Sequence, residues 1–535
     1  MNPLVQTLEE FRLGGTLDSS GRFTLDPVKA REMMERYRLA DPSLYVLNLV
    51  ASAVSGNASF IRVGTSKSQF ELLHDGSPPD RETLEGLFST VLMANKRTLS
   101  HFELAIAVNG ALALNPRDIV VESCDGLKGV RLLISPKQQK LQEFEASDRK
   151  LVRLFIRKQP SFRFWGRPGA EVDEIAVLEE FCSYCPIPIA TMSGRVLNRV
   201  LHWTPSLALR ALTSDIAPPV LFEPPLSTPV VTVEKQEVPY SAVFAVGMLA
   251  EQSPGLILVV NGVSFIGEFQ AFSDSPVHAV VNLCTAGIHK DVSQAGLLRN
   301  DGYEVLMASL KVEVLHTLEQ LAGAWDELTP GARMEALPLL DRLAREWSRS
   351  GQLHQAASLY HQLLTFRVDR FGEHHQEVLD TFANLSVVNL LLGKADQARK
   401  MMLAVAWDLM TTGRYEKGAL FFEKVLELHG DQPQGPEFIE LLQAYSVCLK
   451  QLGRDQQLFK TLERVAQLEK ADFCPPCRLC GCIDPRRDVA IEVEGRSTRA
   501  YICSRCGSGE FQLGSGDLGT IVGAAVEVGG SHALD

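Results

Sequence analysis

The first 165 residues or so alternate between helix-like and strand-like spacing of apolar side chains. Leu44–Ser55 repeats apolar residues every three to four positions, which predicts a helix. Phe60–Val63 and Phe70–His74 are short apolar runs typical of strands, and Asp118–Ser123 with Gly129–Ser135 indicates a further strand pair. The pattern predicts a mixed α/β domain.

A second mixed segment follows, to about Leu321. Its expected strands are interrupted by prolines, as in Ile187–Ala190 and Val230–Val233. Gly255–Gly267 is the most apolar stretch, and Asn261–Gly262 inside it is a dipeptide typical of tight hairpin turns. We therefore expect two buried strands around that turn, within a second α/β domain.

From about Pro330 to Lys470 the pattern is helical and repeats itself. Four glycines each end one helical pattern and begin another, at spacings of 42, 20 and 40 residues. Five positions after each glycine the residue is small in three of four cases, and a larger residue follows at the ninth position. The glycines are Gly351, Gly393, Gly413 and Gly453. A small residue facing a large one lets antiparallel helices pack closely and stack. The short middle step predicts either a helix shared by two units, around Met402–Met410, or a truncated unit.

This helical segment resembles tetratricopeptide repeats. The resemblance lies in Ser350–Gly351, in Leu392–Gly393 and in Tyr415, while Phe371–His375 looks like the longer loop of kinesin-light-chain-type repeats. It implies that the helices bind a protein partner. A plain helical bundle is the alternative.

Composition and charge narrow the function classes. A chain of 535 residues with 45% hydrophobic residues predicts about three to five domains. No stretch reaches the ~20 apolar residues of a membrane-spanning helix, and Met1–Gly15 carries charges where a signal peptide would be apolar. We expect a cytoplasmic protein without a membrane partner. The net charge of −12 also argues against nucleic acid.

A cysteine cluster near the C-terminal end predicts a structural zinc site. Two Cys-x-x-Cys pairs separated by a segment of hairpin length are typical of zinc ribbons, which this segment resembles. We expect strands at Val489–Val493 and Thr498–Ile502 between the pairs, and one short strand at Thr520–Val528 in the glycine-rich tail. The predicted ligands are Cys477, Cys480, Cys503 and Cys506, with Cys474 and Cys482 as alternatives in the first pair.

Four segments of the N-terminal domain follow one another in a recognisable order: Tyr45–Ala58, the strand after it, Leu72–Gly76 and Leu104–Leu112. In this order the domain resembles the GHKL ATPases, the family of gyrase, large heat-shock chaperones, histidine kinases and mismatch-repair proteins. The resemblance implies an ATP pocket between a helix and a sheet. In the family's chaperones and topoisomerases a second domain sends a basic residue to the phosphate. The segment Ala286–Ser293, which contains His289 and Lys290, is the candidate here.

The same resemblance indicates a degenerate pocket. The family's general base falls on Asn48 and its magnesium-holding Asn falls on Ser52. An amide cannot take a proton from water, and serine is a weak ligand for magnesium. His74 stands at the adenine-binding Asp position if Gly76 is aligned, although a one-residue slip lets Asp75 serve. The candidate nucleotide-binding residues are Asn48, Ser52, Asp75 and Gly76, and we expect no useful ATP hydrolysis.

Two smaller signals remain. Cys182 and Cys185 have Cys-x-x-Cys spacing without a second half, so they are interpreted as two structural thiols rather than a metal or redox site. Asp291 and Ser293 lie in the segment that is the candidate for contacting the phosphate, and a capped helix start after a turn explains both residues as well.

The sequence as a whole predicts a multidomain adaptor. It combines a GHKL-like α/β sandwich, a second α/β domain, an all-α tetratricopeptide-like array and a small zinc ribbon. The helical repeats bind a protein partner, and the first two domains act as a regulatory or dimerising platform in a homodimer. A chaperone-like ATP-binding protein with weak ATPase activity is the alternative. The expected domains are 1–163, 164–329, 330–470, 471–512 (zinc ribbon) and 513–535 (glycine-rich tail).

Overall fold

The computed structural model describes ten stretches of the chain and the backbones of four strands near its C-terminal end. The stretches are 41–89, 98–135, 138–145, 149–159, 173–249, 255–272, 275–283, 288–291, 296–428 and 436–469, and the four strands lie between 487 and 521. The chain divides after Leu339 into two compact units. Within the described residues, no helix combines the length and apolar composition needed to cross a bilayer.

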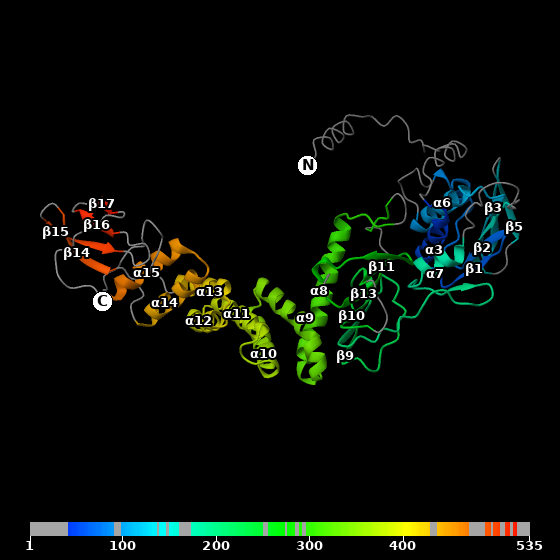
Figure 1. The fold of residues 1–535 in the computed structure, drawn as a ribbon. Coiled ribbons are helices and arrows are strands. Elements are labelled where there is room, and N and C mark those ends of the chain that lie inside the picture. The colour runs from blue at the N-terminus through cyan, green and yellow to red at the C-terminus, as the bar shows by residue number, and fades with distance from the viewer. Residues whose placement is uncertain are drawn as a thin grey trace, which may run out of the picture. The chain divides into compact units, whose positions relative to one another are not determined.

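The first unit opens with a seven-stranded sheet in the order β5-β4-β3-β6-β2-β1-β7 (Figure 1). Neighbouring strands are antiparallel except β1 and β7, which are parallel. The predicted strands at Phe60–Val63 and Phe70–His74 are confirmed within one or two residues. The strands are β1 (Ile61–Thr65), β2 (Gln69–His74), β3 (Asp118–Asp125), β4 (Lys128–Ile134), β5 (Gln139–Glu145), β6 (Lys150–Arg157) and β7 (Ile189–Thr191).

Two long helices, α3 and α6, pack against each other beside this sheet (Figure 1). Every residue of α3 from Tyr45 to Val54 is buried. A helix that is apolar on nearly all sides must be covered on nearly all sides, and α3 indeed also meets β12 of the second sheet. The helices of this part are α3 (Tyr45–Ser55), α4 (Arg81–Glu85), α6 (Leu99–Leu112) and α7 (Glu174–Phe181), after the short η1 (Pro42–Leu44).

A six-stranded sheet forms the rest of the first unit, in the order β12-β11-β13-β10-β8-β9. The predicted turn at Asn261–Gly262 is confirmed, because Val260 pairs with Val263 across it. The strands are β8 (Ala208–Thr213), β9 (Val230–Lys235), β10 (Tyr240–Val246), β11 (Leu256–Val260), β12 (Val263–Gly267) and β13 (Val277–Leu283). The long helix α8 (Asp301–Gly323) packs against β8 and β10, and the short η2 (Gln270–Phe272) and η3 (Trp325–Glu327) flank these elements.

One strand of the first unit joins a different sheet from the one that the sequence suggests. The strand expected at Ile187–Ala190 belongs to the first sheet as β7, because it pairs with β1 from more than 120 residues away. The capped helix start expected at Asp291 and Ser293 would continue through residues 292–295, which lie outside the described residues. The next described helix, α8, is capped by Asn300, whose side chain accepts a hydrogen bond from the Tyr303 N–H. Lys290 forms an isolated β-bridge with Leu297.

A helical array follows, with α9 (Pro330–Arg349) leading into the second unit. The array proper consists of helices that each pack against the next one along the chain. They are α10 (Leu353–Phe371), α11 (Gln376–Leu391), α12 (Ala395–Thr411), α13 (Tyr415–Leu428), α14 (Pro436–Gln451) and α15 (Asp455–Glu469). The mixed α/β sheets and the helical array thus have the order along the chain that the sequence predicts.

A four-stranded antiparallel sheet lies after the array, in the order β14-β15-β16-β17. Its first hairpin confirms the two strands expected between the cysteine pairs. The glycine-rich tail contributes β17, and most of the strand expected at Thr520–Val528 lies outside the described residues, which end at Ile521. β16 was not expected. The strands are β14 (Arg487–Val493), β15 (Arg496–Ile502), β16 (Gly509–Leu513) and β17 (Asp517–Ile521).

Candidate functional site

The repeated small and large positions predicted for the array form its core. Ala356, Ala398 and Gly418, each five residues after a glycine, are buried. The larger residues four positions later, Tyr360 and Met402 among them, are also buried. The pattern therefore marks the contact faces of the helices.

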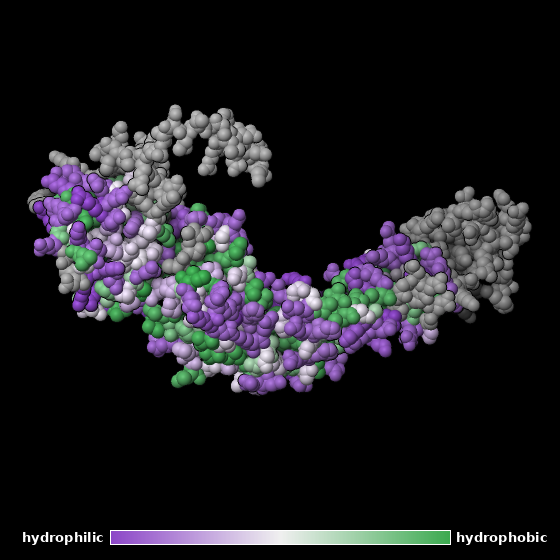
Figure 2. Space-filling model, turned by 180° about the vertical axis from the view of Figure 1, so that it is seen from behind, coloured by the Kyte–Doolittle hydropathy of each residue, from purple (hydrophilic) through white to green (hydrophobic). Residues whose placement is uncertain are grey.

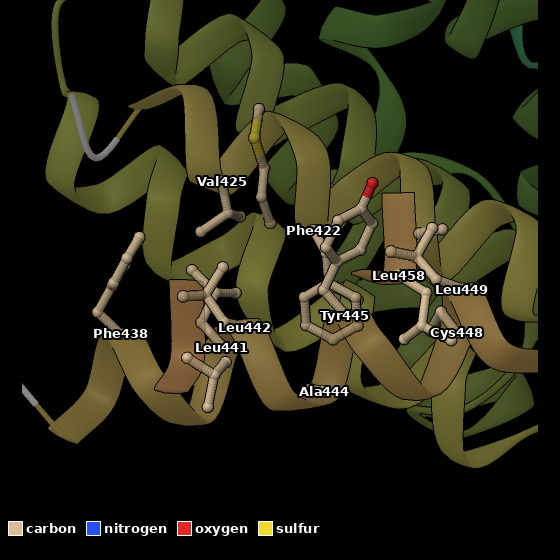
Figure 3. Packing of buried hydrophobic residues seen from close by; sticks show 14 residues of the cluster. Phe422, Val425, Phe438, Leu441, Leu442, Ala444, Tyr445, Cys448, Leu449 and Leu458 are labelled. Carbon is tan, nitrogen blue, oxygen red and sulfur yellow. The ribbon is translucent and has the colours of Figure 1, made fainter. Parts of the chain in front are cut away.

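The core of the second half of the array joins four helices, α12 to α15 (Figure 3). Phe422 of α13 is fully buried, and the centroid of its ring lies 6.5 Å from the centroid of the Tyr445 ring on α14. A Cβ at Gly418 would lie 3.5 Å from the Ala406 carbonyl oxygen and 3.5 Å from Cys448 Sγ. These are ordinary van der Waals distances, so α13 lies close to both α12 and α14 at Gly418.

The short step between Gly393 and Gly413 holds one complete helix. This helix, α12, packs against α11 on one side and α13 on the other. Its partly exposed Trp407 also contacts the buried ring of Phe422, at 5.9 Å between centroids. The step thus holds a single helix, as the sequence predicts, and both a shared helix and a truncated unit stay compatible with it.

A buried arginine ties together the first helices of the second unit. Arg367 of α10 makes a two-pronged contact with the Asp341 carboxylate, and its Nε lies 3.3 Å from Glu377 Oε2 on α11. It also donates to Thr381 Oγ1 at 2.5 Å. Burial alone would lower the pKa of Arg367, but Asp341 and Glu377 outweigh it and raise that pKa. The guanidinium therefore stays charged, and the sequence pattern gave no sign of it.

Four consecutive helices of the array expose large apolar side chains. Figure 2 shows hydrophobic residues among hydrophilic ones on this part of the molecule. Exposed apolar side chains that lie close together are typical of sites where another protein binds. The exposed residues are Val387 and Leu391 on α11, Trp407 on α12, Leu420 on α13 and Val447 on α14.

Two of the predicted nucleotide-binding residues, Asn48 and Ser52, face helix α6. The Asn48 Nδ2 donates to Glu103 Oε2 at 2.6 Å, and both side chains are buried. The Ser52 hydroxyl donates to the Ser100 carbonyl at 2.8 Å, and the Ser100 hydroxyl donates to the Ser52 carbonyl at 2.8 Å. These side chains therefore fasten α3 to α6.

The other two predicted residues lie at the end of β2. The Asp75 carboxylate accepts hydrogen bonds from Ser59, through its hydroxyl and its N–H, and from the Phe60 N–H at 3.3 Å. Burial would raise the pKa of Asp75, but these hydrogen bonds outweigh it and lower that pKa. The Gly76 N–H donates to His74 Nδ1 at 3.1 Å. Burial lowers the pKa of His74 to about 4, against the opposing charge of Asp75.

Sequence reasoning missed Glu103, which meets Lys290 as well as Asn48. Lys290 Nζ lies 2.8 Å from Glu103 Oε1, and both side chains are buried. The basic residue assigned by resemblance to a phosphate is thus paired with a carboxylate of this chain. No local pattern could reveal the pair, because 187 residues separate its members.

The predicted zinc ligands lie outside the described residues. These are Cys477, Cys480, Cys503 and Cys506, and the alternatives Cys474 and Cys482 lie outside as well. Within the part of the chain that the structure describes, no three His, Cys, Asp or Glu side chains form a group suited to a metal ion.

A cavity of about 540 Å³ lies in the first unit and is lined by none of these residues. It is bordered by β12 and by the segment around Arg299, and a second cavity of about 280 Å³ shares Arg299 and Tyr303 with it. Neither cavity is lined by Asn48, Ser52, Asp75 or Gly76.

Comparison with known proteins finds similarity among solved structures. No family model matches the chain, and no curated protein matches it. A Podosopora anserina protein, described as a putative kinesin light chain with nearly identical TPR-like repeats, is 16% identical with a TM-score of 0.17. The match covers 31% of this chain and 90% of that one. A variant of the same Podosopora anserina protein is 16% identical with a TM-score of 0.18, over 32% of this chain and 93% of that one.

Proposed function

We propose that this protein is an intracellular scaffold whose helical array binds another protein. The observation that carries the proposal is that α11, α12, α13 and α14 each expose at least one large apolar side chain. These side chains would be covered in a complex, which stabilises association by about 25 cal/mol per Å² of apolar surface removed from water. The array below them is held by an aromatic core and by the Arg367 cluster, so the surface is presented on a firm support.

The test is affinity capture with the full chain and two surface variants. The first variant carries V387E, L391E and L420E, which place three charges on the apolar surface. The control carries L127E at a still more exposed apolar residue, in the turn between β3 and β4. Proteins retained by the wild type and by L127E, but lost from the triple variant, support the proposal. A retained set that is the same for all three proteins refutes it.

We further propose that the first unit is an ATPase-like platform that does not hydrolyse ATP. Its support is that Asn48 falls on the general-base position of the family that the N-terminal domain resembles, and that the Nδ2 of this amide is already bonded to Glu103. Ser52 is likewise engaged with Ser100, so neither residue fits a magnesium–nucleotide complex without displacing contacts of the fold. Magnesium-dependent phosphate release that is lost in N48A or D75N would instead establish the weak chaperone-like ATPase.

The third proposal is a structural zinc ion in the C-terminal ribbon. Its support is the spacing of Cys477, Cys480, Cys503 and Cys506 around the β14–β15 hairpin. All-sulfur coordination is typical of structural sites. One equivalent of zinc per chain by elemental analysis is expected, and C480S with C503S should remove it. Full zinc content in that double variant would contradict the assignment.

A further inference from the structure

The turn of the β11–β12 hairpin rests directly on helix α3. Asn261 and Gly262 both have positive φ angles, of 50° and 84°. A Cβ at Gly262 would lie 2.8 Å from Val54 Cγ2 and 2.9 Å from Cys185 Sγ. The turn therefore touches α3 and the Cys185 thiol with no space left between them.

A second contact joins the same regions through charge. Lys290 comes from the segment after β13, and its ammonium group reaches Glu103 on α6 at 2.8 Å. Asn48 of α3 donates to the other oxygen of the same carboxylate at 2.6 Å. Only 8% of the Lys290 side chain and 4% of the Glu103 side chain are exposed. A buried pair of this kind is strongly destabilised when one partner is removed.

Two thiols lie beneath these contacts. Cys182 follows the last residue of α7, and the Cys185 N–H donates to the Cys182 carbonyl at 3.0 Å. Both cysteines are fully buried and neither is in a disulfide. Burial raises the pKa of each thiol, and for Cys182 the nearby Lys290 charge acts against that rise. The Cys185 thiol thus touches the turn, and the backbone hydrogen bond holds Cys182 beside it.

We propose that the Asn261–Gly262 turn and the Lys290 segment form a clasp that shields the Cys182–Cys185 pair, and that local opening of this clasp controls exposure of the thiols. Closed, the clasp holds both thiols in their protonated, unreactive form. Open, it leaves them in water, where a thiol near its ordinary pKa of about 8.5 reacts readily. Local openings of this kind cost less than global unfolding.

The experiment measures alkylation of each cysteine in the full-length native protein with iodoacetamide at pH 8, resolved by peptide mass spectrometry. Cys124, in β3 of the same unit, reports global unfolding of that unit, and Cys448 reports the second unit. In the wild type, labelling of Cys182 and Cys185 is expected to be at least tenfold faster than that of Cys124. Because local opening exposes little surface, this rate should change little in low urea.

The variant K290M removes the charged contact and is expected to speed labelling of Cys182 and Cys185 at least tenfold, with Cys124 and Cys448 unchanged. The milder E103Q gives a smaller change in the same direction and serves if K290M does not fold. The matched control is R210M, which breaks another buried pair of the unit, Arg210 with Glu313 at 2.8 Å.

The control R210M lies away from the clasp, so it should not favour labelling of Cys182 and Cys185 over Cys124. The proposal is overturned if K290M speeds all buried cysteines of the first unit in parallel. It is equally overturned if wild-type Cys182 and Cys185 are labelled only as fast as Cys124.

Discussion

Replacing Gly262 with alanine is expected to destabilise the first unit by about 3 kcal/mol. The left-handed backbone at this position costs an L-residue roughly 1–2 kcal/mol. The added methyl group would lie 2.8 Å from Val54 Cγ2 and 2.9 Å from Cys185 Sγ, and forcing an atom into a packed interior costs about 1–3 kcal/mol more.

Gly194 provides the matched control, because it has a φ angle of 91° and no atom within 4 Å of a Cβ. G194A should therefore show the backbone cost alone, about 1 kcal/mol. The assay is urea unfolding followed by pulsed labelling of Cys124, which separates the first unit from the second in a chain that does not unfold in one step. Equal losses in G262A and G194A would refute the close contact between the turn and α3.

Three further changes test the array and the first sheet. G418A should stabilise the second unit by about 0.5–1 kcal/mol, because alanine favours a helix and its methyl group would make only ordinary van der Waals contacts. A destabilised variant would contradict the packing of α13 against α12 and α14 around this residue. R367M should destabilise that unit by about 3 kcal/mol, since it leaves Asp341 without its partner. The stability of G418A and of R367M is measured by urea unfolding followed by labelling of Cys448. His74 has a folded-state pKa of about 4, below its unfolded value. The neutral His74 ring therefore contributes to the free energy of unfolding fully above about pH 6.5, and this contribution is lost as the pH falls toward 4, by up to about 3 kcal/mol. H74N should flatten the dependence of the unfolding free energy on pH in that window. An unchanged dependence would contradict the burial of a neutral ring.

The spacing of apolar and turn-forming residues along the chain was enough to predict the helices, strands and turns that depend on residues close in sequence. The helix at Tyr45–Ser55, the strands around Phe70 and the Asn261–Gly262 turn follow from apolar spacing and turn chemistry. The helical repeats could be predicted for the same reason, because each glycine ends a helix and each small residue marks a contact face. Even the single helix α12 in the short middle step follows from the spacing of the glycines.

Contacts between distant residues could not be predicted in this way. Glu103 and Lys290 are 187 residues apart, and neither stands out on its own in the sequence. β7 joins the first sheet by pairing with β1, although the chain around it resembles the start of the next domain. Arg367 looks like a surface arginine until Asp341 and Thr381 are brought to it. Such pairs are set by the fold and not by the local sequence.

The exposed apolar side chains of the array are expected to contact another polypeptide. This contact can be measured with a photo-crosslinking residue placed at Leu391 in the full-length protein. The same residue at Leu127 is the control, and both positions are exposed. A discrete adduct with a second polypeptide is expected from position 391 and none from position 127. Adducts of the same identity and yield from both positions, or none from either, would contradict it.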